Sequence, residues 1–387
     1  MKRIYLDNNA TTPLLPEVRE AMRPWLEEQF GNAASVHWYG QRARAAIDES
    51  RGAVARLIGA TDHEIVFTSS GTEADNLAIR GVVEALRHKG NHVAVSSVEH
   101  PAVLQSCAVL ERHGFQVTYV AVNSDGILDL DALKASLRPD TVLVSVMLAN
   151  NETGVLQPVQ KVSEIAKAKG ILVHTDAVQA VGKIPVQVDT LGVDLLSLSA
   201  HKIHGPQGVG ALYVRKGVEV EPLLVGGGQE RKRRAGSENV AAVVGFGRAA
   251  EMAGRDLTAE FQRLASMRDE YESQLLKQVP SARINGGRSP RVPNTSNIGF
   301  PGIDGEALLM ALDLEGVAAS LGAACSSGTL EPSHVLKAMK VPDSILRGSL
   351  RFSLGRFNVS EEMSEAVAIL SRVLEHIQSV STPKAGA

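Results

Sequence analysis

The chain has 387 residues, of which 44% are hydrophobic and 21% charged, and its formal net charge is −3. The length suits two domains, or one large domain with an appendage. The proportions are typical of a soluble globular protein. The low charge gives no reason to expect a nucleic-acid or membrane partner, and no apolar run reaches the roughly 20 residues of a membrane helix. Two cysteines suit a reducing compartment and the first residues lack a signal-peptide core, so we expect a cytoplasmic protein.

Between about residues 60 and 215, short runs rich in β-branched residues alternate with segments of helical pattern. The strands that this alternation predicts are 64–69, 92–97, 115–122, 141–148, 171–177, 194–200 and 209–215. The helices that it predicts between them are 73–87, 101–114, 128–137 and 159–170. Because the strands are apolar on both faces, they indicate an α/β fold with a mostly parallel sheet covered by helices on both sides.

The pattern changes after residue 236. Two long helices are expected at 239–253 and 259–279, the second with apolar residues at helical spacing. The elements expected after them are strands at 294–300 and 349–354, a helix that starts near Glu306, and a final amphipathic helix at 360–380. These elements predict a smaller α+β unit.

A lysine lies just beyond one of the predicted strands. Lys202 follows the apolar run 194–200 and precedes a glycine-rich turn. Ligands of open α/β sheets bind beyond the carboxyl ends of strands, and a partly desolvated lysine there has a lowered pKa and becomes an amine nucleophile. Taken alone, an exposed structural lysine at a strand end is an equally good interpretation.

Three further features accompany Lys202. The segment 69–76 (SSGTEADN) follows a strand and opens a helix, so its backbone N–H groups could hold a phosphate, although it has no Walker motif. Asp176, at the end of a strand, could pair with a pyridinium nitrogen or act as a helix N-cap. His100, at the end of another strand, could stack on a ring, shuttle protons or cap a helix.

Together these residues predict a binding site for pyridoxal phosphate (PLP). In such a site a lysine forms a Schiff base with the cofactor, an acid keeps the pyridine nitrogen protonated, and the ring accepts electrons. Each feature is ambiguous alone, but the set of phosphate-binding segment, acid, histidine and lysine favours this cofactor.

Ten motifs, spread from residue 4 to about residue 375, resemble those of cysteine desulfurases of the NifS/IscS type, which are fold-type I PLP enzymes of the class V aminotransferase superfamily. In chain order they are YLDNNATT, GNAASVH, FTSSGTEADNLAI, SSVEHPAVL, VSVMLANNETGVLQP, HTDAVQAVGK, SLSAHKIHGPQGVGALYVR, GGGQERKRRAGSENV, GAACSSG with EPSHVL, and SLRFSLGRF. The resemblance implies a large PLP-binding domain at 15–255 and a small domain, made of 1–14 and 256–387, that carries the catalytic cysteine. It also implies a homodimer with the active sites at the subunit interface.

The resemblance gives roles to individual residues. Lys202 would form the Schiff base, Asp176 would pair with the pyridinium nitrogen, and His100 would stack on the cofactor and assist proton transfers. The other cofactor contacts that the family implies are Gly71, Thr72, Asn151, Gln179, Ser199, His201 and, from the other subunit, Ser237, where the family has threonine. Arg351 would bind the substrate carboxylate, with Asn151 beside it.

Cys325 lies among small residues, between Gly322 and Gly328, and would be the nucleophile of the family. Its thiolate would take the sulfur of L-cysteine as a persulfide, and alanine would leave. The acceptor of that sulfur stays open among an iron–sulfur scaffold, a tRNA-thiolation enzyme and a nitrogenase-maturation protein. Leu321 stands where the family usually has serine, and Cys107 is expected to be a small core residue. No metal site is predicted, and whether an iron–sulfur cluster contacts Cys325 stays open.

Two other classes of function share part of this pattern. An aminotransferase or a selenocysteine lyase would use the same Lys202 and Asp176, although an aminotransferase has no use for Cys325. A PLP-binding regulator without catalysis would be expected to have lost Lys202, Cys325 or Arg351, and all three are present. We therefore predict a PLP-dependent cysteine desulfurase.

Overall fold

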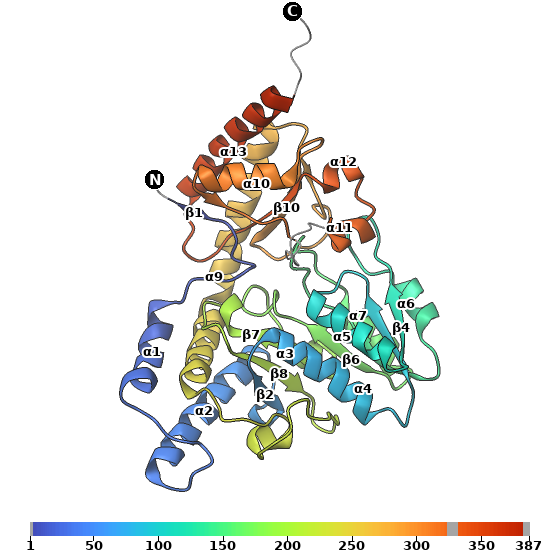
Figure 1. Cartoon of the computed structure of the whole chain (residues 1–387), viewed down its shortest axis with the longest axis vertical. Coiled ribbons are helices and arrows are strands. Elements are labelled where there is room, and N and C mark those ends of the chain that lie inside the picture. The colour runs from blue at the N-terminus through green and yellow to red at the C-terminus, as the bar shows by residue number, and fades with distance from the viewer. Residues whose placement is uncertain (1–2, 323–331, 382–387) are drawn as a thin grey trace, which may run out of the picture.

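The computed structural model describes residues 3–322 and 332–381, and a seven-stranded sheet forms the centre of its larger part (Figure 1). In spatial order the strands are β2 (Ile65–Thr68), β8 (Gly210–Val214), β7 (Leu195–Ser199), β6 (Leu172–Asp176), β5 (Thr141–Ser145), β3 (His92–Ser96) and β4 (Gln116–Val120). Within this sheet β8 alone is antiparallel to its neighbours. The predicted mostly parallel sheet is therefore confirmed.

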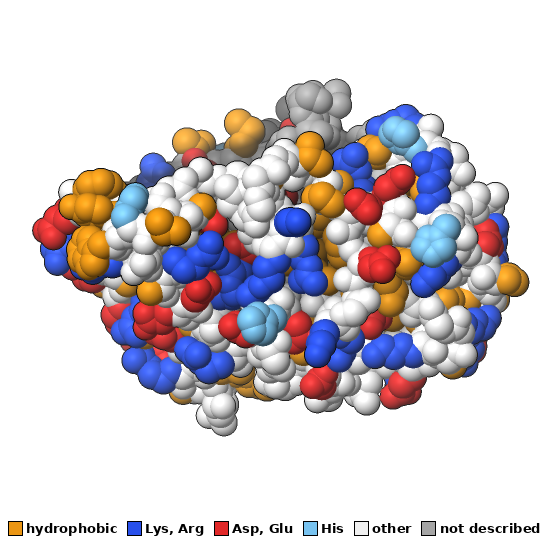
Figure 2. Space-filling model, turned by 90° about the horizontal axis from the view of Figure 1, so that it is seen from below, with side chains coloured by type: hydrophobic (Ala, Val, Ile, Leu, Met, Phe, Trp, Pro, Cys, Tyr) orange, Lys and Arg blue, Asp and Glu red, His pale blue; other side chains and the backbone are white. Residues whose placement is uncertain are grey.

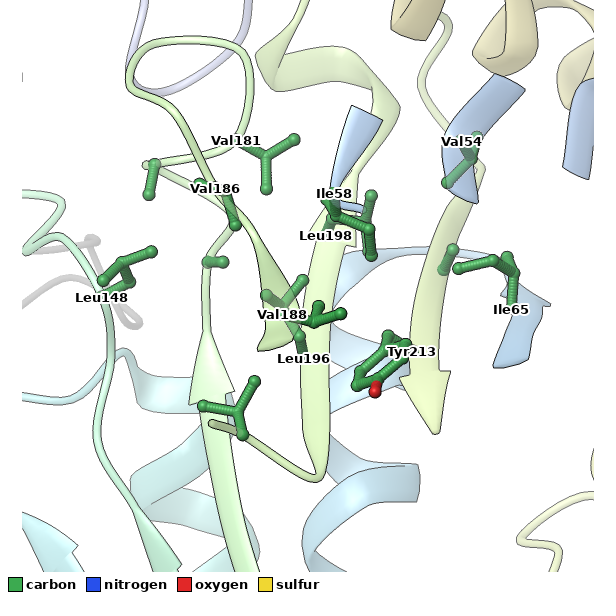
Figure 3. Packing of buried hydrophobic residues seen from close by; sticks show 14 of the residues in the cluster. Val54, Ile58, Ile65, Leu148, Val181, Val186, Val188, Leu196, Leu198 and Tyr213 are labelled. Carbon is green, nitrogen blue, oxygen red and sulfur yellow. The ribbon is translucent and has the colours of Figure 1, made fainter. Parts of the chain in front are cut away.

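Helices pack on both faces of this sheet, because the side chains of each strand alternate between two hydrophobic cores. In β7, Leu196 and Leu198 belong to one core and Leu195 to the other. Figure 3 shows Leu196 and Leu198 in the first core, near Ile58 and Val188. The helices around the sheet are α1 (Pro16–Glu27), α2 (Trp38–Leu57), α3 (Gly71–Asn76), α4 (Val82–Ala85), α5 (Pro101–Arg112), α6 (Leu130–Ser136), α7 (Val159–Lys167) and α8 (Val188–Leu191), with short helical segments η1 (Asp62–Glu64), η2 (Leu77–Gly81), η3 (Ala200–Lys202) and η4 (Gln229–Lys232).

Local sequence explains several helix boundaries. The α5 helix begins with Pro101 at its first position, where the missing N–H costs nothing. The α6 helix begins after Asp129, whose carboxylate accepts the N–H groups of Asp131 and Ala132. The helix predicted at 73–87 is instead interrupted by the π-helical turn η2. These boundaries determine which residues lie between each strand and the helix that follows it.

The two long helices expected at 239–253 and 259–279 are one helix, α9 (Val240–Gln278), so that prediction was wrong. The polar and glycine residues between them suggested a break, but a single glycine in a helix costs only about 1 kcal/mol. Packing outweighs that cost, since α9 contacts α1, α2 and α13 (Ser360–Ser381). In Figure 1 this helix runs from the larger part of the molecule into the smaller one.

The smaller part contains a separate hydrophobic core, which joins Ile4 and Leu6 to side chains between Leu264 and Leu374. Its elements are β1 (Ile4–Tyr5), β9 (Arg283–Ile284), β10 (Thr295–Gly299), α10 (Gly305–Leu314), β11 (Val317–Ala318), α11 (His334–Ala338), α12 (Asp343–Leu346), β12 (Ser349–Ser353) and α13. A three-stranded sheet has the order β12-β10-β9, and β1 pairs with β11. On the strength of the separate cores we propose a large domain at 15–255 and a small one made of 1–14 and 256–387.

The described surface carries both signs of charge. Basic and acidic side chains are interspersed on the face shown in Figure 2, and hydrophobic side chains gather at one end of that face. Within the described ranges, no helix is long and apolar enough to cross a membrane.

Candidate active site

Four candidate residues lie at the carboxyl ends of adjacent strands. His100 follows β3, Asn151 follows β5, Asp176 ends β6, and Lys202 lies three residues after the end of β7. These strands are consecutive neighbours in the sheet and run parallel. Because the carboxyl ends of parallel strands share one edge, residues distant in sequence meet there, as the strand positions predicted.

His100 is held by the helix that it precedes. Its Nδ1 accepts the backbone N–H of Ala102 at 3.1 Å, so the side chain caps α5. In the neutral ring that bond leaves the proton on Nε2, where it can be donated. The capping interpretation of His100 is therefore right, and it also orients the imidazole beside Asp176.

Asp176 lies beside His100 and Asp75, and one nitrogen or oxygen atom from each of these three side chains lies within 4.8 Å of the other two. Burial raises the pKa of Asp176, and the neighbouring imidazole of His100 opposes that shift. Burial lowers the pKa of His100, and Asp176 opposes that shift. Asp176 Oδ1 also accepts the backbone N–H of Val178 at 2.9 Å, so the carboxylate does cap the segment that follows it, although that segment is a turn and not a helix. A buried carboxyl of this kind is suited to a cationic ring nitrogen, which would stabilise its ionised form.

Lys202 is the amine of the site. Burial lowers its pKa to about 8, with the positive charge of Arg351 as the second cause. Its Nζ donates to the carbonyls of Asn9 at 2.7 Å and Ala10 at 2.6 Å. A lysine in this environment is neutral far more often at neutral pH than an exposed one, which makes it a competent nucleophile and base.

The residues expected to bind the phosphate gather around Gly71, at the start of α3. The Ser199 hydroxyl is buried and has no hydrogen-bond partner among the described residues. A Cβ added at Gly71 would lie 2.8 Å from Val178 and 3.4 Å from the Cβ of Ser199, so only glycine lets the backbone come this close to Ser199. An unpaired buried hydroxyl beside the first turn of a helix suits a phosphate, and these residues therefore fit PLP.

The other two residues expected at the phosphate are Thr72, which follows Gly71 in the chain, and His201, which lies two residues after Ser199. Thr72 is exposed at the second position of α3. His201 Nδ1 is 3.1 Å from the Thr11 hydroxyl, and burial lowers the pKa of His201 to about 4. His201 is therefore neutral at physiological pH and can contribute a hydrogen bond but no charge.

Arg351 projects from β12 of the small sheet towards the strand ends of the large one. It is 5% exposed. Its Nη1 donates to the Asn151 carbonyl at 3.0 Å and its Nη2 to Asp7 Oδ1 at 2.7 Å. The guanidinium thus lies on the Asn151 side of the site, where a carboxylate ligand could bind it.

Three residues of this site were not predicted: Asp7, Asn9 and Lys183. The Asn9 carbonyl accepts from Gln179 Nε2 at 2.9 Å as well as from Lys202. The Lys183 ammonium donates to Asn9 Oδ1 at 3.0 Å and to Gln179 Oε1 at 2.5 Å, and burial lowers its pKa well below the usual range. All three lie in motifs that carried the family resemblance, YLDNNATT and HTDAVQAVGK, and that was the only signal for them.

Two candidate residues are not among those that the described contacts bring together. Ser237 is exposed, a few residues after η4. Its segment is tied to the large domain by Glu230, whose carboxylate accepts from Arg51 at 2.7 and 2.8 Å. Cys325 lies outside the described residues. On its N-terminal side, Ser320 pairs through its backbone with Arg351.

Comparisons with known proteins identify the family of this chain. The aminotransferase class-V family matches residues 4–365. A cysteine desulfurase IscS of Dictyoglomus turgidum is 51% identical over 99% of this chain and 98% of its own, and one of Methanosarcina thermophila is 48% identical over 99% and 95%. A solved structure of a NifS-like protein superposes with a TM-score of 0.91 at 39% identity, covering 97% of this chain and all of its own. The chain therefore belongs to the class-V aminotransferases and, within them, to the PLP-dependent cysteine desulfurases.

Proposed function

We propose that this enzyme removes sulfur from L-cysteine, using PLP held by Lys202, and transfers that sulfur to Cys325. The observation that supports this most directly is Lys202 itself, a half-buried amine whose pKa is lowered to about 8. It lies beyond β7, while Asp176 and His100 lie at the ends of strands in the same sheet. Bound PLP supplies an electron-accepting ring that stabilises the charge left when the α-proton of the substrate is removed.

Each neighbouring residue has a defined part in this proposal. Asp176 would pair with the ring nitrogen, and His100 would lie against the ring, with its cap to α5 fixing its orientation. Asn151 and Gln179 would contact the ring oxygen. Gly71, Thr72, Ser199 and His201 would hold the phosphate, together with Ser237 from a second subunit.

Lys202 and Arg351 handle the substrate. Arg351 binds the α-carboxylate, which fixes the amino acid in one orientation. The neutral amine of Lys202 then takes the α-proton, and the carbonyls of Asn9 and Ala10 lie at hydrogen-bonding distance to receive the resulting ammonium.

Cys325 supplies the thiolate that accepts the sulfur. The carbon–sulfur bond of L-cysteine breaks, a sulfur–sulfur bond to Cys325 forms, and the carbon takes a proton, so the products are L-alanine and the persulfide. The sum of L-cysteine and one enzyme thiol equals the sum of L-alanine and one enzyme persulfide, so no outside oxidant is needed. The persulfide then passes its sulfur to an acceptor, for which we propose an iron–sulfur scaffold protein.

We propose further that the enzyme works as a cytoplasmic homodimer. The exposed aromatic side chains of Phe30, Trp38 and Tyr39 support a subunit contact, since Phe30 is 69% and Trp38 60% exposed in the single chain. Phe30 and Tyr39 also stack on each other, with ring centroids 4.9 Å apart. Large exposed aromatic groups are typical of protein interfaces. The unpaired thiol of Cys107 suits a reducing cytoplasm.

The test is the yield of alanine and sulfide from L-cysteine with a thiol reductant, for the native enzyme, Cys325→Ala and Cys107→Ala. Equal amounts of alanine and sulfide from the native enzyme, lost in Cys325→Ala while PLP stays bound, would support sulfur transfer through Cys325. Cys107→Ala is the matched control, because Cys107 is the other cysteine and lies in the core. Undiminished activity of Cys325→Ala would reject the proposal and favour a selenocysteine lyase or an aminotransferase.

A further inference from the structure

The guanidinium of Arg351 already holds one carboxylate, that of Asp7. Asp7 Oδ1 lies 2.7 Å from Arg351 Nη2, and the two groups form an ion pair. Arg351 Nη1 bonds to the Asn151 carbonyl, and Arg351 Nε is buried without a hydrogen-bond partner among the described residues. Of the three guanidinium nitrogens, Nε is thus the one without a hydrogen bond among the described residues, and Nη2, which shares an edge with it, bonds to Asp7.

That arrangement conflicts with the way in which arginine binds a carboxylate ligand. The strongest geometry uses two parallel N–H groups on one edge of the guanidinium, and Nε and Nη2 form such an edge. The opposite end is engaged by the Asn151 carbonyl. Nη2 has two N–H groups, so a ligand carboxylate on the Nε and Nη2 edge either displaces Asp7 or shares Nη2 with it, and in the second case two negative charges lie side by side.

Asp7 can give way without moving its backbone. The backbone carbonyl of Asp7 accepts from the Tyr5 hydroxyl at 3.0 Å and from the Ala10 N–H, and Asp7 also forms a β-bridge with Ser353. The side chain of Asp7 is 21% exposed, against 5% for Arg351, so the carboxylate lies on the solvent side of the pair. Rotation of one short side chain would therefore open the guanidinium.

We propose that Asp7 occupies the carboxylate position of Arg351 in the resting enzyme and competes there with the α-carboxylate of substrate and product. This rests on the proposed function, in which Arg351 binds that carboxylate. A competitor inside the site weakens ground-state and transition-state binding alike, so it raises KM and leaves kcat unchanged. It also weakens the hold on L-alanine, which must leave after each turnover.

The test is ligand binding to the PLP-loaded Asp7→Asn enzyme, measured from the change in cofactor absorbance. L-alanine and ethylamine form a matched pair, since ethylamine is alanine without its carboxylate. Asp7→Asn should lower the Kd of L-alanine about three- to tenfold, as expected for removal of a partly buried charged competitor, and leave that of ethylamine unchanged. The KM of L-cysteine should fall by the same factor.

The comparison with ethylamine also separates a second effect of the substitution. The charge of Asp7 raises the pKa of Lys202, so Asp7→Asn perturbs the amine as well. An effect through Lys202 would change the binding of both ligands, whereas competition at Arg351 changes only that of alanine. Asp125→Asn is the control for the loss of one negative charge, because it breaks an exposed ion pair, to Arg288 at 2.8 Å, elsewhere on the molecule.

Arg351→Gln distinguishes failure of this inference from failure of the proposed function. If Arg351 binds the carboxylate, Arg351→Gln weakens the binding of alanine and spares that of ethylamine. An unchanged affinity for alanine in Arg351→Gln would reject the substrate role of Arg351 itself. If Arg351→Gln raises the Kd of L-alanine but Asp7→Asn does not lower it, the proposed competition by Asp7 is wrong and the role of Arg351 in binding the carboxylate stands.

Discussion

The uptake of PLP by Lys202 should depend on pH with a midpoint near 8. Burial and then Arg351 lower the pKa of this amine from 10.5 to about 8, against the opposing charges of Asp176 and Asp7. At pH 7, roughly one amine in eleven is neutral with this pKa, against roughly one in three thousand for an ordinary lysine. Because the neutral amine is the nucleophile, the reactive fraction at that pH is roughly 300-fold larger than for an ordinary lysine, and the uptake rate should rise by a smaller factor because a less basic amine is a weaker nucleophile.

The sign of the dependence follows from the lowered pKa. The rate should rise as pH increases through about 8 and level off above it, while an ordinary lysine would still be gaining near pH 10. Arg351→Gln removes a positive charge that lowers the pKa of Lys202, so the midpoint should move upward by about half a unit to one unit. Arg347→Gln is the matched control, since Arg347 is exposed in the same domain and its loss changes the net charge equally.

The assay starts from protein freed of PLP and follows the absorbance of added PLP over a pH series. Borohydride then fixes the cofactor to its lysine, and peptide mass analysis locates the label. A midpoint near 10 in the native protein would refute the claim that burial activates Lys202. A label on any other lysine would refute the assignment of the site, and an unmoved midpoint in Arg351→Gln would mean that its charge does not act on Lys202.

Two further predictions concern the support of the site. Asp176→Asn should weaken the binding of PLP and slow the loss of the α-proton, because a neutral amide cannot balance a protonated ring nitrogen. Absorbance titration measures the binding, and exchange of the α-proton in deuterated water measures its loss. Undiminished turnover would contradict the role of Asp176. Glu230→Gln should destabilise the protein by about 3–5 kcal/mol in equilibrium unfolding, because it removes the buried carboxylate that pairs with Arg51 and leaves only the exposed Asp48, 3.8 Å away, to balance that charge. Exposed Glu219→Gln is its control, and equal stability of the two variants would mean that the Arg51 charge is compensated elsewhere.

Much of the site could be predicted because its parts are local to strand ends. A buried strand is a short apolar run, and the residue after it lies at an edge of the sheet whatever the rest of the fold does. That reasoning identified Lys202, Asp176 and His100 as candidates, and it identified Cys107 as a core residue, which is fully buried. Whether a helix or a turn follows Asp176 could not be predicted, because the short segment after it carries no clear signal for either one.

The α9 helix shows the opposite case. Its sequence contains a weak point that helix propensity alone interprets as a break. The contacts with α1, α2 and α13, which come from distant parts of the chain, decide that the helix continues. Local propensity differences of about 1 kcal/mol per residue are easily outweighed by such packing.

The fold class, the chain order of the seven strands in the large sheet and the chemistry of the residues at their ends could all be predicted from the sequence. Only the tertiary structure decided that Asp7 meets Arg351 and that Asn9 meets both Lys202 and Lys183. Asp7 and Arg351 are separated by 344 positions, and no periodicity or propensity links residues so far apart. Such pairs form because the N-terminal segment crosses between the two sheets, and that path is fixed by the burial of Ile4 and Leu6 in the small core.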